Sequence, residues 1–195
     1  MNRASVIESL KDIQQDGEVL AYFYCDFRNE RSTNAAEVMR SLLSQLLQQS
    51  RRHAVDLGHL IDQLVEERDE GALTTSSAML LAGYLIRAAS QFPRPPILVI
   101  EALDECKDIT VLLNVLVESR KGGVRLFLTS RPLQIIKEEL SSFPLIDMET
   151  VNYLILADIR LHVTKELDSR RRLRVLDEDW KDEIYSALCN KAGGM

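Results

Sequence analysis

Three acidic residues crowd the end of one apolar run, and their side chains are the first candidates for chemistry. The run ILVI (97–100) stops at Glu101, and Asp104 and Glu105 follow within four positions. Carboxylates are costly to bury alone, so this group needs water, cations or hydrogen-bond donors as partners. A hydrated magnesium ion would suit, because it prefers one or two carboxylates together with phosphate oxygens. The alternative is a solvated loop in which Asp104 caps the next helix, the commoner arrangement for acids after a strand.

Polar residues also follow two other apolar runs. Thr129, Ser130 and Arg131 lie at the end of VRLFL, and Asp26 directly follows VLAYFYC. If these runs are parallel strands, their carboxyl ends share one edge of the sheet, which is where such sheets bind ligands. An arginine at that edge can meet a phosphate, whose geometry matches the planar guanidinium group. The sequence therefore predicts one polar rim formed by the ends of three strands.

Strand and helix patterns alternate along the chain. Runs that are apolar without alternation, as in a parallel sheet covered on both faces, occupy 19–25, 97–101, 124–129 and, more weakly, 144–148. Helical periodicity lies between and after them, at 34–50, 53–68, 76–91, 108–120, 132–140, 158–167 and 178–191. The predicted fold class is α/β with a mainly parallel sheet.

Composition narrows the possible partners and the compartment. The 195 residues carry a net charge of −6, which predicts no nucleic-acid binding, and the longest apolar stretch, 78–86, is too short to span a bilayer. Three cysteines, Cys25, Cys106 and Cys189, are too few and too scattered for a disulfide framework or a metal site. We therefore expect a cytoplasmic protein without a membrane partner.

One basic cluster stands out from this acidic balance. The stretch SRRRLR (169–174) could contact phosphates of nucleic acid or of lipid headgroups. The acidic stretch DEDW follows at 177–180. A solvated linker between two helices, with its charges balanced by that neighbour, is the simpler interpretation.

Three segments in order carry a family resemblance. The stretch LAYFYCDFRNERSTNAAEVMRSLLSQLL, then ILVIEALDEC, then LFLTSRP, resembles the NACHT-type nucleotide-binding domain of STAND P-loop NTPases. More narrowly, it is similar to the nephrocystin-like version common in fungal ankyrin-repeat proteins. The resemblance implies a three-layer P-loop NTPase-like core with sheet order 5-1-4-3-2. It also implies Mg²⁺ and ATP or GTP as cofactors, and coupling to other protein domains or self-association.

The resemblance assigns roles to the residues of the predicted rim. Glu101 takes the position of the magnesium-orienting acid (Walker B), where the family has aspartate, and Asp104 is a second metal candidate. Asp104 and Glu105 match the acids that position or activate the attacking water. Arg131 matches the sensor of the terminal phosphate, and the cofactor-binding candidates Thr129 and Ser130 precede it.

The phosphate-binding loop (P-loop) of this family has no counterpart in the sequence. A P-loop needs G-x-x-x-x-G-K-[ST], and none of the eight glycines precedes a lysine. Residues 2–14 resemble the helix that normally follows the loop, so we expect strand 1 and the P-loop to be lacking. The expected organisation is a partial NACHT core over 1–150 and the start of the following helical region over 151–195.

Two functions from different classes follow. The first is that of the parent family, a nucleoside-triphosphatase that acts as a signalling switch. This polypeptide alone is expected to bind ATP or GTP weakly and to be inactive. In that case it would need no cofactor. The alternative is a non-catalytic interaction or structural remnant module. A third, less favoured idea is a metal-dependent hydrolase that uses Glu101, Asp104 and Glu105 without a P-loop; its hydrolysis would disappear in Glu105→Gln.

Overall fold

A three-stranded parallel sheet lies at the centre of the first part of the chain. The structure is a computed structural model that describes residue 7 and residues 18–28, 34–69, 78–148, 150 and 152–192. The strands are β1 (Leu20–Tyr24), β2 (Ile97–Glu101) and β3 (Arg125–Leu128), in the order β1-β2-β3. Both pairings are parallel. The α/β fold class with a parallel sheet is therefore confirmed.

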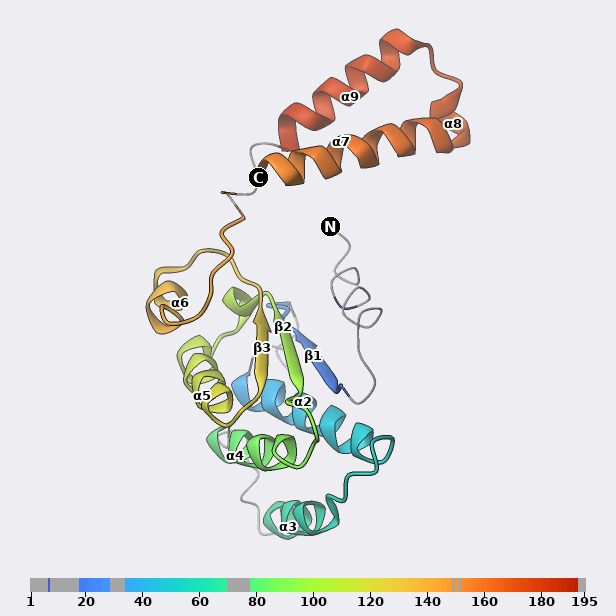
Figure 1. The fold of residues 1–195 in the computed structure, drawn as a ribbon. Helices are drawn as coiled ribbons and strands as arrows, with labels where there is room; N and C mark the ends of the chain where they lie inside the picture. The colour runs from blue at the N-terminus through green and yellow to red at the C-terminus, as the bar shows by residue number, and fades with distance from the viewer. Residues whose placement is uncertain are drawn as a thin grey trace. The chain divides into compact units, whose positions relative to one another are not determined.

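Helices connect the strands and cover the sheet (Figure 1). In the first part of the chain they are α2 (Ala35–Ser50), α3 (Gly58–Asp69), α4 (Ala78–Ala89), the 3-10 turn η2 (Leu103–Glu105), α5 (Ile109–Lys121) and α6 (Gln134–Glu139). Helix α2 begins where the sequence predicts, because the Asn34 side chain accepts a hydrogen bond from the Ala36 N–H at 2.8 Å. Glu37, in the first turn of α2, forms an ion pair with Arg40.

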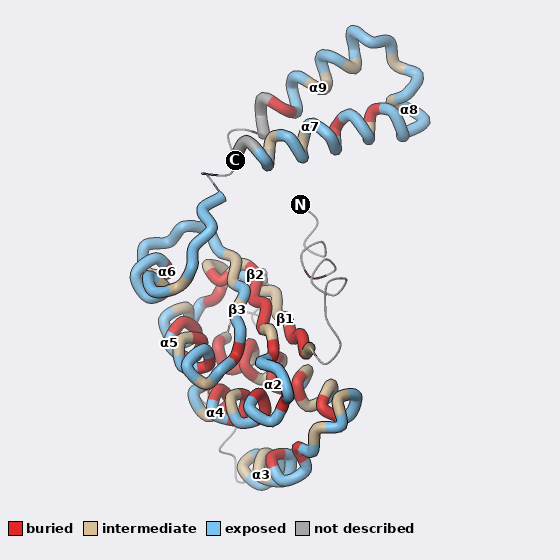
Figure 2. The backbone as a smooth tube through the Cα atoms, viewed as in Figure 1, coloured by how far each residue is buried: buried red, intermediate tan, exposed pale blue. Residues whose placement is uncertain are grey.

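The main core lies between one face of the sheet and helices α2, α4 and α5 (Figure 2). Alternation along each strand sends every second residue to this face. Its largest fully buried side chains include Leu42, Leu46, Leu85, Leu98, Ile100, Leu112 and Leu116. On the other face, Leu20 and Val99 form a smaller cluster with the helical residue Ile7. The rest of the predicted first helix, 2–14, lies outside the described residues.

The predicted fourth strand at 144–148 is wrong. Residues 144–147 form no regular structure, and the Leu145 and Ile146 side chains are 79% and 73% exposed. A strand needs a neighbour to satisfy its backbone groups. Within the described ranges β2 is the only strand beside β3, and no strand pairs with the segment itself.

Two helix boundaries also differ from the predictions. Helix α3 starts at Gly58 instead of 53, because Ala54 adopts a left-handed conformation (φ 54°) that interrupts helical geometry after α2. The Asp56 carboxylate then accepts a hydrogen bond from the Gly58 N–H at 2.9 Å. The helix predicted at 158–167 is longer: α7 spans Asn152–Ser169.

The chain divides into two compact units, Met1–Phe143 and Pro144–Met195. The second unit contains α7, the short α8 (Arg171–Arg174) and α9 (Glu178–Ala192), and α7 packs against α9. Its buried apolar residues are Val163, Leu167 and Cys189. None of the helices in the described ranges combines the length and the apolar character that crossing a bilayer requires.

Candidate functional site

The carboxyl ends of the three strands meet, as the sequence predicts. The Cys25 N–H donates to the Glu101 carbonyl at 3.0 Å, which continues the β1–β2 ladder by one residue. The Thr129 N–H donates to the Ile100 carbonyl at 3.0 Å, which does the same for β2 and β3. The residues just beyond the strands therefore leave the sheet side by side, and we call this edge the rim.

Thr129 holds the turn that carries the acids. Directly after β2, Ala102 adopts a left-handed conformation (φ 56°, ψ 50°) that is costly for a residue with a Cβ. The Thr129 hydroxyl oxygen accepts a hydrogen bond from the Ala102 N–H at 3.2 Å, and the Thr129 carbonyl accepts one from the Leu103 N–H at 3.0 Å. Leu103 is fully buried and anchors the turn in the core. The fixed turn then directs Asp104 and Glu105.

Asp104 faces the end of β3. Its Oδ1 accepts a hydrogen bond from the Arg131 N–H at 3.0 Å and lies 3.3 Å from the Ser130 hydroxyl. Its Oδ2 lies 3.5 Å from the Arg131 Nε. The Asp104 side chain is 7% exposed, whereas that of Arg131 is 77% exposed. The acid is therefore held inside the rim, and the guanidinium group projects from it.

Glu105 turns the other way, toward the loop after β1. Its Oε2 accepts a hydrogen bond from the Phe27 N–H at 3.2 Å. In the same loop, Asp26 binds the Arg28 side chain through an ion pair of 3.1 Å. The two neighbouring acids thus link β2 to both flanking strands, one through Asp104 to the end of β3 and the other through Glu105 to the end of β1.

Glu101 is a buried acid at the end of β2. As a whole residue it is 9% exposed, and it lies opposite Tyr24 in the β1–β2 register. Its side chain belongs to the sheet face of Val99, because alternate residues of a strand share a face. The structure therefore places all six predicted residues along one rim, with Asp104, Ser130 and Arg131 in direct contact and Glu101 set deeper.

Two buried thiols lie beneath the rim. Burial, with smaller contributions from the nearby Cys106, Glu105 and Asp104, raises the pKa of Cys25 to about 12. Burial also raises the pKa of Cys106 to about 11, against a hydrogen bond from the Asp108 backbone that lowers it. Because the thiolate is the nucleophile, both thiols are poor candidates for covalent chemistry.

The donor set fits a magnesium ion that is shared with phosphate. The described residues hold no group of three or more His, Cys, Asp or Glu side chains able to bind a metal ion by themselves. Magnesium commonly takes only one or two protein carboxylates and completes its shell with phosphate oxygens and water. Of the two predicted metal residues, Glu101 and Asp104, Glu101 matches that requirement in chemistry. Asp104 is already engaged by donors from Ser130 and Arg131.

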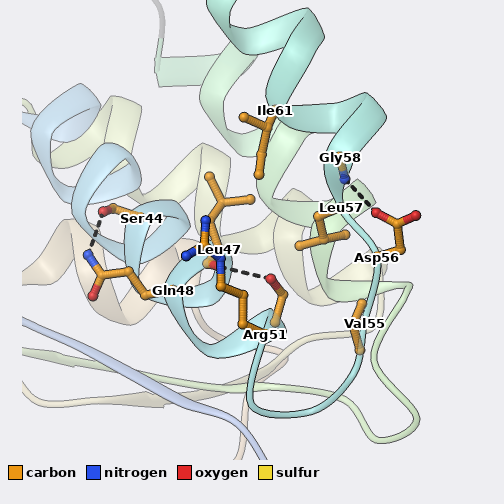
Figure 3. A pocket seen from close by; sticks show the side chains of 10 residues that line it. Ser44, Leu47, Gln48, Arg51, Val55, Asp56, Leu57, Gly58 and Ile61 are labelled. Carbon is orange, nitrogen blue, oxygen red and sulfur yellow. Dashed lines mark hydrogen bonds between the residues drawn. The ribbon is translucent and has the colours of Figure 1, made fainter.

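A separate pocket of about 560 Å³ lies between the end of α2 and the start of α3 (Figure 3). Apolar side chains such as Leu47, Leu57 and Ile61 line it together with Arg51 and Asp56. None of the rim residues lines this pocket. It does not contribute to the candidate site.

Comparison with known proteins identifies the family. The sequence profile described as "Nephrocystin 3, N-terminal" matches residues 3–131, more than half of the 195-residue chain. The chain belongs to the nephrocystin 3 N-terminal family. The match ends at Arg131 and so includes every residue of the candidate rim. No curated protein and no solved structure matches the chain.

Sequence reasoning missed two features of this nephrocystin-type rim. The left-handed Ala102 carries no sequence signature, because glycine is the residue that usually marks such a conformation. The Phe27 N–H donor to Glu105 is a backbone group, which residue types cannot reveal. The Asp104–Arg131 pair, by contrast, follows from the parallel strand ends that the sequence predicts.

Proposed function

We propose that the rim is the phosphate-facing edge of a nucleotide-dependent switch domain of the NACHT type. The observation that carries the proposal is the Asp104–Arg131 pair, in which one partner is held inside and the other projects outward. A terminal phosphate needs such an arginine, since the planar guanidinium group binds phosphate oxygens through paired N–H donors. Arg131 is the proposed sensor.

The pair would allow the rim two arrangements. In the structure, the Arg131 Nε lies 3.5 Å from Asp104 Oδ2. A phosphate that takes over the guanidinium group would leave Asp104 with its donors from Ser130 and the Arg131 backbone. Asp104 would then orient a water molecule beside the phosphate, and Glu105 is the proposed general base. A positioned acid and a charge-stabilising arginine are recurring parts of phosphoryl transfer.

Magnesium and ATP or GTP are the proposed cofactors. Glu101 would hold the ion from the protein side, with Asp104 contributing once Arg131 moves, and Glu105 would stay unligated as the base. When bound, Mg²⁺ supplies positive charge against the phosphate oxygens. Thr129 keeps the acid-bearing turn in place, through hydrogen bonds to Ala102 and Leu103, and Ser130 supports Asp104.

Affinity for nucleotide should be low in the 195-residue polypeptide. It contains no G-x-x-x-x-G-K-[ST] loop, and that loop supplies most of the phosphate contacts in P-loop domains. We expect calorimetry with Mg-ATP or Mg-GTP to give a dissociation constant no tighter than about 0.1 mM. Micromolar binding would contradict this expectation.

Chemical-shift mapping tests the site even at low affinity. Mg-ATP added in millimolar amounts to the ¹⁵N-labelled polypeptide should shift the amides of 101–106 and 129–131. Arg131→Ala should abolish most of these shifts. Arg125→Ala is the matched control, because Arg125 lies at the other end of β3 and binds Glu18 and the Pro95 carbonyl. Shifts that fall elsewhere, or that survive in Arg131→Ala, would refute the proposed site.

A second candidate function is a non-catalytic interaction module. One observation favours it: the donors that Asp104 engages, Ser130 and Arg131, both belong to the chain itself. In that case the rim acids would serve to tie the strand ends together. The same titration discriminates, since such a module would show no shifts along the rim at any Mg-ATP concentration.

A further inference from the structure

Helix α8 and the first turns of α9 form a charged end of the second unit that the nucleotide proposal does not use. Arg171, Arg172 and Arg174 of α8 are all exposed. Their guanidinium groups make no hydrogen bond or ion pair with the residues that the structure describes. Arg170 differs, because it pairs with Glu166 of α7. We call the three unpaired arginines the basic tip.

Helix α9 presents the opposite charge directly afterwards. Asp179, Asp182 and Glu183 are exposed and spaced i, i+3 and i+4, so they are neighbours on the helix surface. Within the described ranges these three carboxylates also have no side-chain partner. Glu178, by contrast, pairs with Lys181. We call Asp179, Asp182 and Glu183 the acidic face.

Two exposed apolar side chains belong to the same segment. Val175 directly follows the basic tip and is 77% exposed, and Trp180, which lies between Asp179 and Asp182 in the sequence, is 57% exposed. An exposed tryptophan within a charged surface is typical of residues that anchor protein–protein contacts. Basic, apolar and acidic elements therefore follow one another over residues 171–183.

Like charges at these spacings repel one another, and water and salt screen that repulsion only in part. Opposite charges from a partner would replace it with attraction. The basic tip and the acidic face are neighbours in the chain, yet the structure pairs none of their charges with each other. We propose that this end of the second unit docks on the same end of a second copy. The basic tip of one copy then binds the acidic face of the other, twice over, about a two-fold axis.

A second copy fits better than a nucleic acid or an anionic membrane. Phosphates would meet the basic tip and the acidic face together, and the carboxylates would repel them. A partner must therefore present both signs of charge in reversed order. The same segment of another copy does so by symmetry, with Val175 and Trp180 covered between the two charge contacts.

Charge reversal in two complementary variants tests the proposal with the full chain. Sedimentation velocity should show wild-type dimers that weaken by about tenfold or more when salt is raised from about 0.05 M to about 0.5 M. Arg171→Glu with Arg174→Glu should be monomeric, and so should Asp179→Lys with Glu183→Lys. An equimolar mixture of the two variants should restore the dimer, because each reversed patch then meets its opposite.

Trp180 reports on the same contact, since it is the single tryptophan of the chain. The fluorescence emission of Trp180 should lie at shorter wavelength in the wild type and in the mixture than in either variant alone. Arg51→Glu with Arg52→Glu, a matched reversal at the exposed end of α2, should leave the dimer intact. A monomeric wild type, a mixture that stays monomeric, or binding of the wild type to RNA or anionic vesicles in place of itself would overturn the proposal.

Discussion

Asp104 combines a buried carboxylate with donors of two kinds, and their separate contributions can be measured. The Arg131 N–H and the Ser130 hydroxyl bind one oxygen, while the exposed guanidinium group lies near the other. An ion pair with a solvent-exposed partner contributes about 0–1 kcal/mol, because water screens it. A buried acceptor that satisfies a backbone donor contributes more reliably. Asp104 therefore serves the fold mainly as an acceptor, and its charge contributes little to stability.

Substitutions at 104 should separate these contributions. Asp104→Ala removes the acceptor as well as the charge and should lower the free energy of unfolding by about 1–2 kcal/mol. Asp104→Asn keeps an oxygen for the Arg131 N–H and should lower it by less than about 1 kcal/mol. Arg131→Ala is the control. It keeps the main-chain N–H at 131 and should change the free energy of unfolding least. Urea denaturation measures all three, and equal losses for Ala and Asn would contradict this account.

The buried thiols predict a loss of stability at alkaline pH. In the unfolded chain a thiol titrates near 9.0, whereas the folded pKa is about 12 for Cys25 and about 11 for Cys106. Above pH 9.0 the unfolded state therefore loses protons first, and the free energy of unfolding falls until the folded pKa is reached. Well below pH 9.0 both thiols are protonated in both states, and their contribution to stability is fully present. Between about pH 8.5 and 10.5 the free energy of unfolding of Cys25→Ala should fall less than that of the wild type. If urea denaturation gave parallel curves of stability against pH, the raised pKa of Cys25 would be contradicted.

At the scale of elements, glycines at two positions have opposite roles. A Cβ on Gly122, which follows α5, would lie 2.5 Å from the Cγ2 of Ile86 in α4, so this glycine permits close packing of the two helices. Gly83 in α4 is exposed, and a Cβ there would meet no atom within 4 Å. Helix propensity alone then governs the effect of a substitution at Gly83.

The two glycines form a matched pair for thermal unfolding. Gly122→Ala should lower the free energy of unfolding by about 1–3 kcal/mol, because the half-buried Ile86 side chain must move away from the new methyl group. Gly83→Ala should raise it by about 1 kcal/mol through helix propensity. Calorimetric melting temperatures check both signs. A stabilising Gly122→Ala would show that α4 and α5 can separate at no cost.

The elements that the sequence predicts correctly are those with dense local patterns. Continuous apolar runs ending in polar residues predict all three strands and the rim, and Asn34 predicts the start of α2. The segment 144–148 shows why such patterns can mislead, since its apolar residues have no strand neighbour in the described structure and stay exposed. The Ala102 turn and the Phe27 donor depend on backbone geometry, which residue types do not encode.

At the scale of the whole chain, the division into two units falls between Phe143 and Pro144. The segment that follows is irregular, and Leu145, Ile146 and Met148 are all at least half exposed. Exposed backbone without regular hydrogen bonds is the preferred substrate of proteases. The domain boundary that the sequence places at 150 stays a prediction.

Limited proteolysis tests this division. Chymotrypsin or thermolysin at low dose should cut within 144–150 and leave a fragment that retains α2, α4 and α5. Mass spectrometry of the early products identifies the site. A chain in which α2 or α4 is cut while 144–150 survives would contradict the assignment of two independently packed units.

The rim has a consequence for sequence variation among relatives. Phe27 and Arg131 each hold an acid through the main-chain N–H, and Thr129 holds Leu103 through its carbonyl. Main-chain groups are common to almost all amino acids, so the side chains at 27 and 131 can change without displacing Glu105 or Asp104. Proline is the exception, because it has no N–H to donate. Descendants of this sequence can therefore change the side chains exposed at this edge while its acidic scaffold keeps its shape.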